Sequence, residues 1–325
     1  MSRHIPDISG AMHSLKQSGP HHDDEEQPLV SLSDVAEIEL MILRRMREVT
    51  IGDHRSMAHG SGFDFVGLRD WQPGDRPSAI DWPQSTITNF TPLIVREFEQ
   101  PSTASVVVVA DVSLSTRCGT HGVPIAKAIA RAIATIGMSA VFFQDMFGML
   151  TFGEDLGRFS AIRPRIGRSH VIHCLDAYER QVGLQDVRFA GSLSMTIGSF
   201  MRRTALIPFV SDFLFADPAS VIRELALLNS SHDVFVVLID AAFAFELPSP
   251  SAGWVDAFDV ETGRSRILSR GAMAHLAERV RSWQDEVVAA AKNQDVDLVR
   301  VGIDHTATDL ALAEFVAERR LRKVS

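Results

Sequence analysis

Apolar runs alternate with helical spacings from residue 105 to the C-terminus. The clearest run covers 105–111, and over 122–143 the apolar residues then recur every three or four positions, which is typical of a strand followed by a helix. Further strands are expected over 146–152, 158–162, 205–213, 233–240 and 296–301, further helices over 168–182, 192–203, 217–229, 271–293 and 308–322, and a hairpin over 254–260 and 265–268. Apolar strands alternating with helices predict an α/β fold, a mostly parallel sheet with helices on both faces.

The first hundred residues follow a different pattern. Residues 1–30 are polar and are expected to form a disordered tail. A helix is expected to start near Ser31, because Ser31 and Asp34 have capping-box spacing and apolar residues follow at helical intervals. Residues 50–100 are rich in Gly, Asp, Pro and aromatic residues, which predicts loops with short strands at 63–68 and 93–98. The expected domains are the tail (1–30), an N-terminal helix and β module (31–104) and the α/β domain (105–325).

Composition narrows the class of protein. The chain has 325 residues, 46% of them hydrophobic, and a formal net charge of −9. A general nucleic-acid binder would be basic, so this class is disfavoured. The two cysteines, Cys118 and Cys174, form no CxxC pair, which argues against a disulfide framework or a thiolate zinc site and fits a reducing cytoplasm. The apolar stretch 125–143 contains Lys127 and Arg131, so we expect a core helix there. The first thirty residues have no apolar leader, and the expected location is cytoplasmic.

Candidate chemistry begins at Asp111, which ends an apolar strand and is followed by Ser113 and Ser115. Ligands of an open parallel sheet bind beyond the carboxyl ends of its strands. Alternate residues of an extended chain point the same way, so one carboxylate and two hydroxyls are expected on one side. Oxygen donors of this kind suit Mg²⁺ or Mn²⁺.

A second predicted strand ends in Asp212, which places another carboxylate at the same edge of the sheet. Between these strands, Ser192 opens a predicted helix and offers a further hydroxyl, and Thr196 is the alternative ligand one helical turn later. Each residue also has an ordinary structural explanation, because serine and aspartate cap helices and form turns. In combination they favour a metal site, and the residues expected to hold the ion are Asp111, Ser113, Ser115, Ser192 and Asp212.

This set of residues resembles the metal-ion-dependent adhesion site of von Willebrand factor A domains, whose first part is Asp-x-Ser-x-Ser. The resemblance implies a von Willebrand factor A-like (Rossmann-like) fold and a divalent cation, Mg²⁺ or else Mn²⁺ or Ca²⁺. Two positions depart from that pattern. Ser192 stands where threonine is usual, and Phe213 follows Asp212 where many A domains have glycine.

A block upstream of the sheet resembles the signature of the bacterial family called domain of unknown function 58. In that family, Gly-x-Arg-x-Tyr/Trp-x-Pro-Gly-Asp and then Ile-Asp-Trp precede an A-like domain. The matching positions are Gly67, Arg69, Trp71, Pro73, Gly74, Asp75, Ile80, Asp81 and Trp82. The Pro-Gly-Asp part predicts a turn, the tryptophans large apolar anchors, and the charged residues a buried ion network. We interpret the block as packing between the module and the sheet, with a partner-docking surface as the alternative.

The resemblance implies a protein-interaction module that is not an enzyme, whose cation accepts a carboxylate from another protein. Such proteins are commonly linked with MoxR-type AAA+ ATPases in chaperone-like systems that mature, or insert metal into, another complex, so this ATPase and a client complex are the expected partners. One alternative is a Mg²⁺-dependent phosphatase or phosphotransferase with Asp111 as nucleophile. Those enzymes usually carry a second aspartate two residues on as general acid, and here that position is Ser113. A purely structural domain is the third possibility.

Overall fold

The computed structural model describes residues 13–14, 28–53, 64–73, 75, 77, 80–99, 104–120, 123–153, 156–201, 203–245, 254–259, 265–302 and 305–322. The chain forms two compact units. The larger comprises Met1–Leu43 and Ala104–Ser325, and the smaller comprises Arg44–Thr103.

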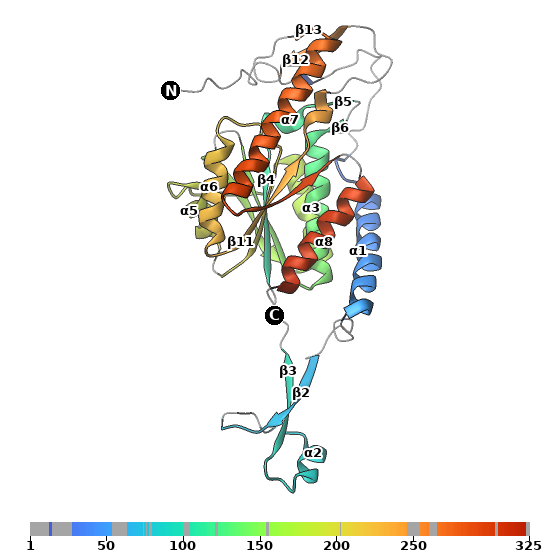
Figure 1. Ribbon diagram of the computed structural model, residues 1–325, viewed down its shortest axis with the longest axis vertical. Helices are drawn as coiled ribbons and strands as arrows, with labels where there is room; N and C mark the ends of the chain where they lie inside the picture. The colour runs from blue at the N-terminus through green and yellow to red at the C-terminus, as the bar shows by residue number, and fades with distance from the viewer. Residues whose placement is uncertain are drawn as a thin grey trace. The chain divides into compact units, whose positions relative to one another are not determined.

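A seven-stranded sheet forms the centre of the larger unit (Figure 1). Its strands, in spatial order, are β14 (Asp297–Val301), β11 (Asp233–Ile239), β10 (Leu206–Ser211), β4 (Ser105–Asp111), β7 (Met146–Phe152), β8 (Phe159–Arg165) and β9 (Gln185–Val187). The strands from β14 to β7 are parallel, and β8 and β9 are antiparallel at one edge. The predicted mostly parallel sheet is confirmed, although the sequence did not predict β9.

Helices cover both faces of this sheet, as the alternating pattern predicted (Figure 1). Helices α3 (Ile125–Phe142), α4 (Arg168–Arg180) and α8 (His305–Arg322) pack together on one face, and α5 (Leu193–Phe200), α6 (Pro218–Asn229) and α7 (Arg270–Asn293) pack on the other. In the part of the chain that the structure describes, α3 is the one helix long and apolar enough to cross a membrane. Because 78% of that helix is buried, it serves here as the core helix that was expected.

Strand β10 contains Pro208 although it lies inside the sheet. Its register with β4 pairs Leu206 with Val106 and resumes at Phe209 with Val109. The gap falls at the proline, whose nitrogen carries no hydrogen to donate. With β11 on its other side, β10 keeps a continuous register. The backbone pairing between β4 and β10 is therefore interrupted in its middle.

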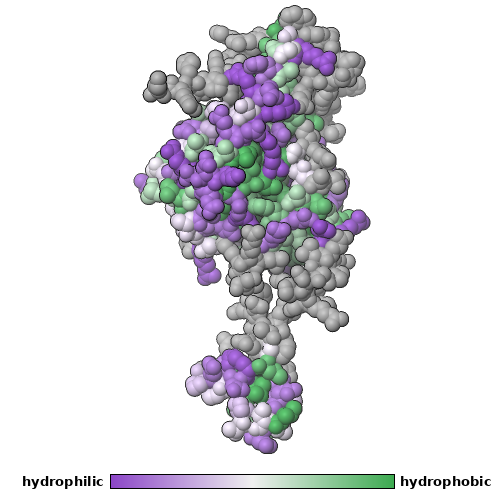
Figure 2. All heavy atoms as spheres, in the orientation of Figure 1, coloured by the Kyte–Doolittle hydropathy of each residue, from purple (hydrophilic) through white to green (hydrophobic). Residues whose placement is uncertain are grey.

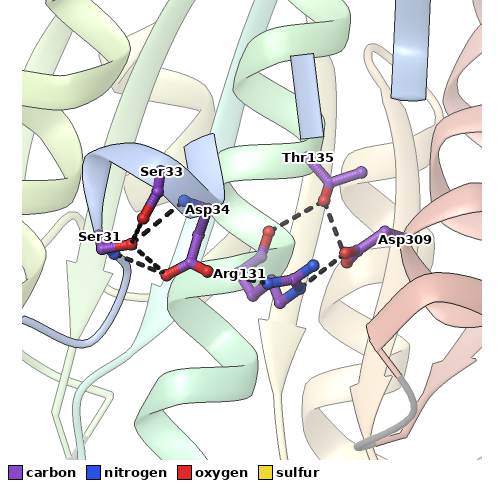
Figure 3. A network of polar contacts seen from close by, with 6 residues as sticks. All are labelled: Ser31, Ser33, Asp34, Arg131, Thr135 and Asp309. Carbon is purple, nitrogen blue, oxygen red and sulfur yellow. Dashed lines mark hydrogen bonds and ion pairs between the residues drawn. The ribbon is translucent and has the colours of Figure 1, made fainter. Parts of the chain in front are cut away.

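A buried polar network joins α1 (Leu32–Asp53), α3 and α8 (Figure 3). Arg131 Nε of α3 donates to Asp309 Oδ2 of α8 at 2.7 Å, and the Thr135 hydroxyl donates to Asp309 Oδ1 at 3.3 Å. Asp34 Oδ1 of α1 lies 3.7 Å from Arg131 Nη1. The predicted capping box is confirmed, because the Ser31 amide donates to Asp34 Oδ2 and the Asp34 amide donates to Ser31 Oγ.

The division into units differs from the expected domain boundaries. We expected the N-terminal module to begin at residue 31, but the structure divides the chain between Leu43 and Arg44, inside α1. The first half of α1 belongs to the sheet unit because its acidic side chains pair with that unit. Besides the Asp34 contact, Glu39 Oε2 lies 3.0 Å from Arg168 Nε of α4.

The smaller unit contains two antiparallel strands and a short helix. The strands are β2 (Asp64–Asp70) and β3 (Ile94–Glu99), close to the predicted ranges. The helix α2 (Trp82–Ile87) was not predicted, because six residues are too few to establish a helical period.

A second sheet of the larger unit contains the predicted hairpin, β12 (Trp254–Asp259) and β13 (Ser265–Ser269). It also includes β1 (His13–Ser14), β5 (Gly119–Thr120) and β6 (Val123–Pro124). The expected disordered tail lies largely outside the described residues.

Candidate functional site

The structure brings Asp111 and Asp212 together at one edge of the central sheet. Asp111 is the last residue of β4 and Asp212 follows β10, and these strands are neighbours. Both side chains are fully buried, at 0% exposure. Two like charges so placed repel each other and are poorly solvated.

The two serines after Asp111 are also at this edge. The Ser113 amide donates to Asp111 Oδ1 at 2.8 Å, and the hydroxyl oxygens of Ser113 and Ser115 are 2.9 Å apart. Two residues that were not expected at the site also hold Asp111. The Ser211 hydroxyl donates to Asp111 Oδ2 at 2.6 Å, and the Tyr178 hydroxyl of α4 donates to the Asp111 carbonyl at 3.0 Å.

Asp212 is the less satisfied of the two acids. Its Oδ1 accepts from the Leu214 amide at 2.9 Å, and its Oδ2 is buried with no hydrogen-bond partner among the described residues. Burial, and then the charge of Asp111, raise the pKa of Asp212 to about 7, and its interactions with Leu214 and Ser115 oppose that rise. A divalent cation between the two acids would relieve the repulsion and give the orphaned oxygen a ligand.

Phe213 follows Asp212 in a conformation that glycine adopts more easily. Its φ of 57° lies in the left-handed region. The ring is fully buried and lies 5.5 Å from the Phe209 ring and 5.3 Å from the Phe215 ring. Packing therefore compensates for the strain at this position.

Two side chains of helix α7 hold the backbone at Asp212 and Phe213. Trp283 Nε1 donates to the Phe213 carbonyl at 2.9 Å. Gln284 Nε2 donates to the Asp212 carbonyl at 3.0 Å and to the Ile239 carbonyl at 2.7 Å. Gln284 is fully buried, so its amide group joins the ends of β10 and β11 inside the protein. These bonds orient the peptide that carries Asp212.

The hydrogen bonds of Ser192 and Thr196 are local to α5 and the turn before it. Ser192 caps α5, with its Oγ accepting from the Met195 amide at 3.2 Å. Thr196 is buried, donates to the Ser192 carbonyl at 2.6 Å and accepts from the Ala190 amide at 3.0 Å. Ser192 therefore has the ordinary capping role, and Thr196 lies inside α5, where its hydroxyl joins the helix to the preceding turn.

The donor set at this edge is small. Within the residues that the structure describes, no three His, Cys, Asp or Glu side chains lie together as a metal site. A cation here would depend on the carboxylates of Asp111 and Asp212, the hydroxyls of Ser113 and Ser115, and water. These are the oxygen donors that Mg²⁺ and Ca²⁺ accept, so the residues fit a hard divalent ion.

Among the described residues of the upstream block, the charged side chains form a partly exposed ion pair and a helix cap, and not the buried network that was expected. Arg69 and Asp75 form a bidentate pair, with both N–O distances 2.7 Å, but the Arg69 side chain is 36% exposed. The hydrogen bond from Arg69, followed by that from the Gln72 amide, lowers the pKa of Asp75 to about 2. Asp81 instead caps α2, where it accepts from the Gln84 amide at 3.2 Å.

The tryptophans of the block are not core residues of the smaller unit. Trp71 is 38% exposed and Trp82 is 56% exposed. Helix α2, which Trp82 begins, buries Ser85 and no large apolar side chain among its six residues. That the tryptophans anchor the module to the sheet stays a prediction. Gly74 lies outside the described residues.

Four residues at the site were missed as contacts, namely Tyr178, Ser211, Trp283 and Gln284. For Gln284 the sequence does contain a signal. It occupies a position in the buried stripe of α7, whose other members are Met273, Ala277, Val280, Val287 and Ala291. An uncharged polar residue in such a stripe indicates a buried hydrogen-bonding role.

Comparison with known proteins identifies the family of this chain. The family described as "Protein of unknown function DUF58" matches residues 67–290, so the chain belongs to the DUF58 family. The chain is 25% identical over 259 residues to uncharacterized protein Rv1480 of Mycobacterium tuberculosis and to uncharacterized protein Mb1516 of Mycobacterium bovis, with 75% of this chain and 78% of each relative covered.

Two solved structures are similar at 16% sequence identity. The conserved hypothetical protein BatB from Bacteroides thetaiotaomicron has a TM-score of 0.38, with 66% of this chain and 98% of that chain covered. An aerotolerance-related membrane protein from Bacteroides fragilis has a TM-score of 0.39, with 66% and 99% covered.

Proposed function

We propose that this protein is a cation-dependent protein-interaction module of the von Willebrand factor A type and not an enzyme. Asp111, Ser113, Ser115 and Asp212 hold a divalent ion, Mg²⁺ or else Mn²⁺ or Ca²⁺, and a partner's carboxylate completes its coordination. The observation that carries the proposal is the pairing of two fully buried carboxylates, one with an oxygen that has no hydrogen-bond partner among the described residues. A buried acid pair is stable when a cation or a proton neutralises it.

The partner is proposed from the family resemblance. DUF58 proteins are commonly linked with MoxR-type AAA+ ATPases, and we propose that this chain acts with such an ATPase in maturing, or inserting metal into, a client complex. Such a system operates in the cytoplasm, which agrees with the composition of the chain.

Isothermal titration calorimetry of the full chain with Mg²⁺ and with Mn²⁺ tests the cation site. We expect wild-type protein to bind one ion and Asp111→Ala to bind none. Ser113→Ala is expected to bind at least tenfold more weakly, because it removes one of few donors. The matched control is Asp240→Asn, which alters the acid after the neighbouring strand β11, where its carboxylate accepts from the Ala242 amide. That variant should bind like wild type.

The partner half of the proposal is tested by capturing a MoxR-type ATPase of the same organism with and without EDTA. We expect capture that EDTA and Asp111→Ala abolish. Equal capture by Asp111→Ala in EDTA would refute the adhesion mechanism. Turnover of an aryl phosphate that depends on Asp111 would instead favour the phosphatase alternative.

A further inference from the structure

Exposed arginines lie at the same edge of the sheet as the candidate cation site. Sheet register connects them to it, because Asp111 pairs with Phe152, Phe152 with Phe159, and Phe159 with Val187. These four residues form one row from β4 to β9, about 14 Å long at the usual strand spacing.

The next residue beyond this row on each outer strand is an arginine. Arg158 precedes Phe159 on β8, and Arg188 follows Val187 on β9. A third arginine, Arg117, ends the short 3₁₀ helix that contains Ser115. All three side chains are exposed. We call Arg117, Arg158 and Arg188 the rim arginines.

The rim arginines form no ion pair with the residues that the structure describes. Arg158 and Arg188 continue an antiparallel ladder as opposite neighbours, and like charges so placed repel each other. The surrounding segment is basic in an otherwise acidic protein. Residues 154–203 contain eight arginines and five acidic residues, whereas the whole chain has a net charge of −9. This segment therefore has a local excess of positive charge.

Two described acids of this edge lie on the other side of the candidate site. Asp217 follows β10 and caps α6, and Asp240 follows β11. In the strand order, β10 and β11 lie on one side of β4, whereas β7, β8 and β9 lie on the other. Among the described residues of this edge, these two acids therefore lie on the β10–β11 side and the rim arginines on the β8–β9 side.

We infer that the rim arginines form a docking surface for an acidic segment of a protein partner. This inference rests on the proposed function and specifies its partner, since one acid of the segment would reach the cation while its neighbours lie along β8 and β9. Arginine pairs with carboxylates through two hydrogen bonds, and complementary charge also steers the encounter. The net charge of −9 opposes a general nucleic-acid ligand.

The test measures binding of a fluorescein-labelled octaglutamate peptide to the full chain by fluorescence anisotropy in Mg²⁺. The double variant Arg158→Gln/Arg188→Gln should weaken binding about fivefold, the sum expected for two exposed ion pairs. The matched control is Arg163→Gln/Arg165→Gln, which removes two exposed arginines from the opposite end of β8, about 17 Å away along the strand. This control should change binding by less than twofold.

The outcomes separate this inference from the cation proposal. If the rim variant binds the peptide as tightly as wild type, or if both arginine pairs weaken binding equally, the docking surface is refuted. Tighter binding of labelled octauridylate RNA than of the peptide at the rim arginines would also refute it. If EDTA and Asp111→Ala leave peptide binding unchanged while the rim variant weakens it, the cation proposal fails and the docking surface stands.

Discussion

Asp212 has surroundings that oppose its charge. It is fully buried, one carboxylate oxygen has no hydrogen-bond partner in the described part of the chain, and Asp111 adds a like charge nearby. An acid in this position destabilises the folded protein when it is ionised and no cation is bound. Such a cost at a strand end is typical of functional positions.

Replacing Asp212 by asparagine should therefore stabilise the protein in the absence of a cation. The pKa of Asp212 rises from 3.8 to about 7 on folding, so its penalty is absent below pH 4, grows between pH 4 and pH 7, and levels off above pH 7 at about 4 kcal/mol. Urea denaturation in EDTA should show little difference between wild type and Asp212→Asn at pH 4, and the variant more stable at pH 8.

Addition of Mg²⁺ provides the control for that experiment. The ion should raise the free energy of unfolding of wild type and leave Asp212→Asn unchanged, because a ligand stabilises the state that binds it. An asparagine variant less stable than wild type at pH 8 in EDTA would mean that the carboxylate is held by contacts that favour its charge.

Only some contacts of the site could be predicted from single residues. Asp111, Ser113 and Asp212 lie at the ends of apolar strands, and the carboxyl ends of parallel strands meet at one edge of a sheet. Their positions in the sequence were therefore sufficient to predict that they lie close together. Tyr178 and Gln284 reach the site from helices α4 and α7 on opposite faces of the sheet. Their contacts depend on how each helix is placed against the sheet, which a hydrophobic period does not specify.

Among the helices and strands, α3 and α4 approach each other at a glycine. A Cβ atom built on Gly137 of α3 would lie 2.6 Å from Val171 Cγ1 of α4 and 3.3 Å from the Phe147 ring. Glycine in the interior of a helix costs stability relative to alanine, so close packing is the reason for its presence here.

Gly137→Ala is expected to destabilise the protein by about 1–3 kcal/mol, because the added methyl group overpacks a buried contact. Thermal unfolding followed by circular dichroism measures the loss. Gly137→Ala/Val171→Ala removes the clashing group and should be more stable than expected from the sum of the two single changes. Strict additivity would refute the contact as the cause.

The long helices and strands were predicted from periodicity, and the short ones were not. The period of α3 is clear over eighteen residues, and β4 and β11 are continuous apolar runs. By contrast, α2 has six residues and β9 has three, which are too few for a period to be recognised. The split of α1 between two units depends on ion pairs with residues far along the chain, which local pattern does not contain.

For the chain as a whole, the Arg131 network connects segments from near its two ends. Asp34, Arg131 and Asp309 belong to helices separated by up to 275 positions in sequence, and Arg131 and Asp309 are buried. Burial raises the pKa of Asp309, and the charge of Arg131 opposes that rise. The ion pair between Arg131 and Asp309 holds α8 against α3, and the same guanidinium group contacts Asp34 of α1.

Arg131→Met should destabilise the protein by about 3–5 kcal/mol, because it leaves the Asp309 carboxylate buried without its cation. The pKa of Asp309 should rise further in this variant, so the loss should be larger at pH 8 than at pH 5, where the neutral carboxyl group needs no partner. Urea denaturation at the two pH values measures both effects.

The double variant Arg131→Met/Asp309→Leu is the control for charge. It should recover most of the lost stability, since an apolar pair of similar volume replaces a buried ion pair at little cost. Equal stability losses in the single and double variants would mean that the network acts through packing and not through its charges.

Pro208 affects how firmly the two strands at the candidate site are held together. Strands β4 and β10, which lead to the buried acids, lack backbone pairing in the middle of their contact, because the nitrogen of Pro208 carries no hydrogen to donate. A cation bound by both carboxylates would link the C-terminal ends of these two strands. It would thereby stabilise a strand pair whose backbone hydrogen bonding is incomplete.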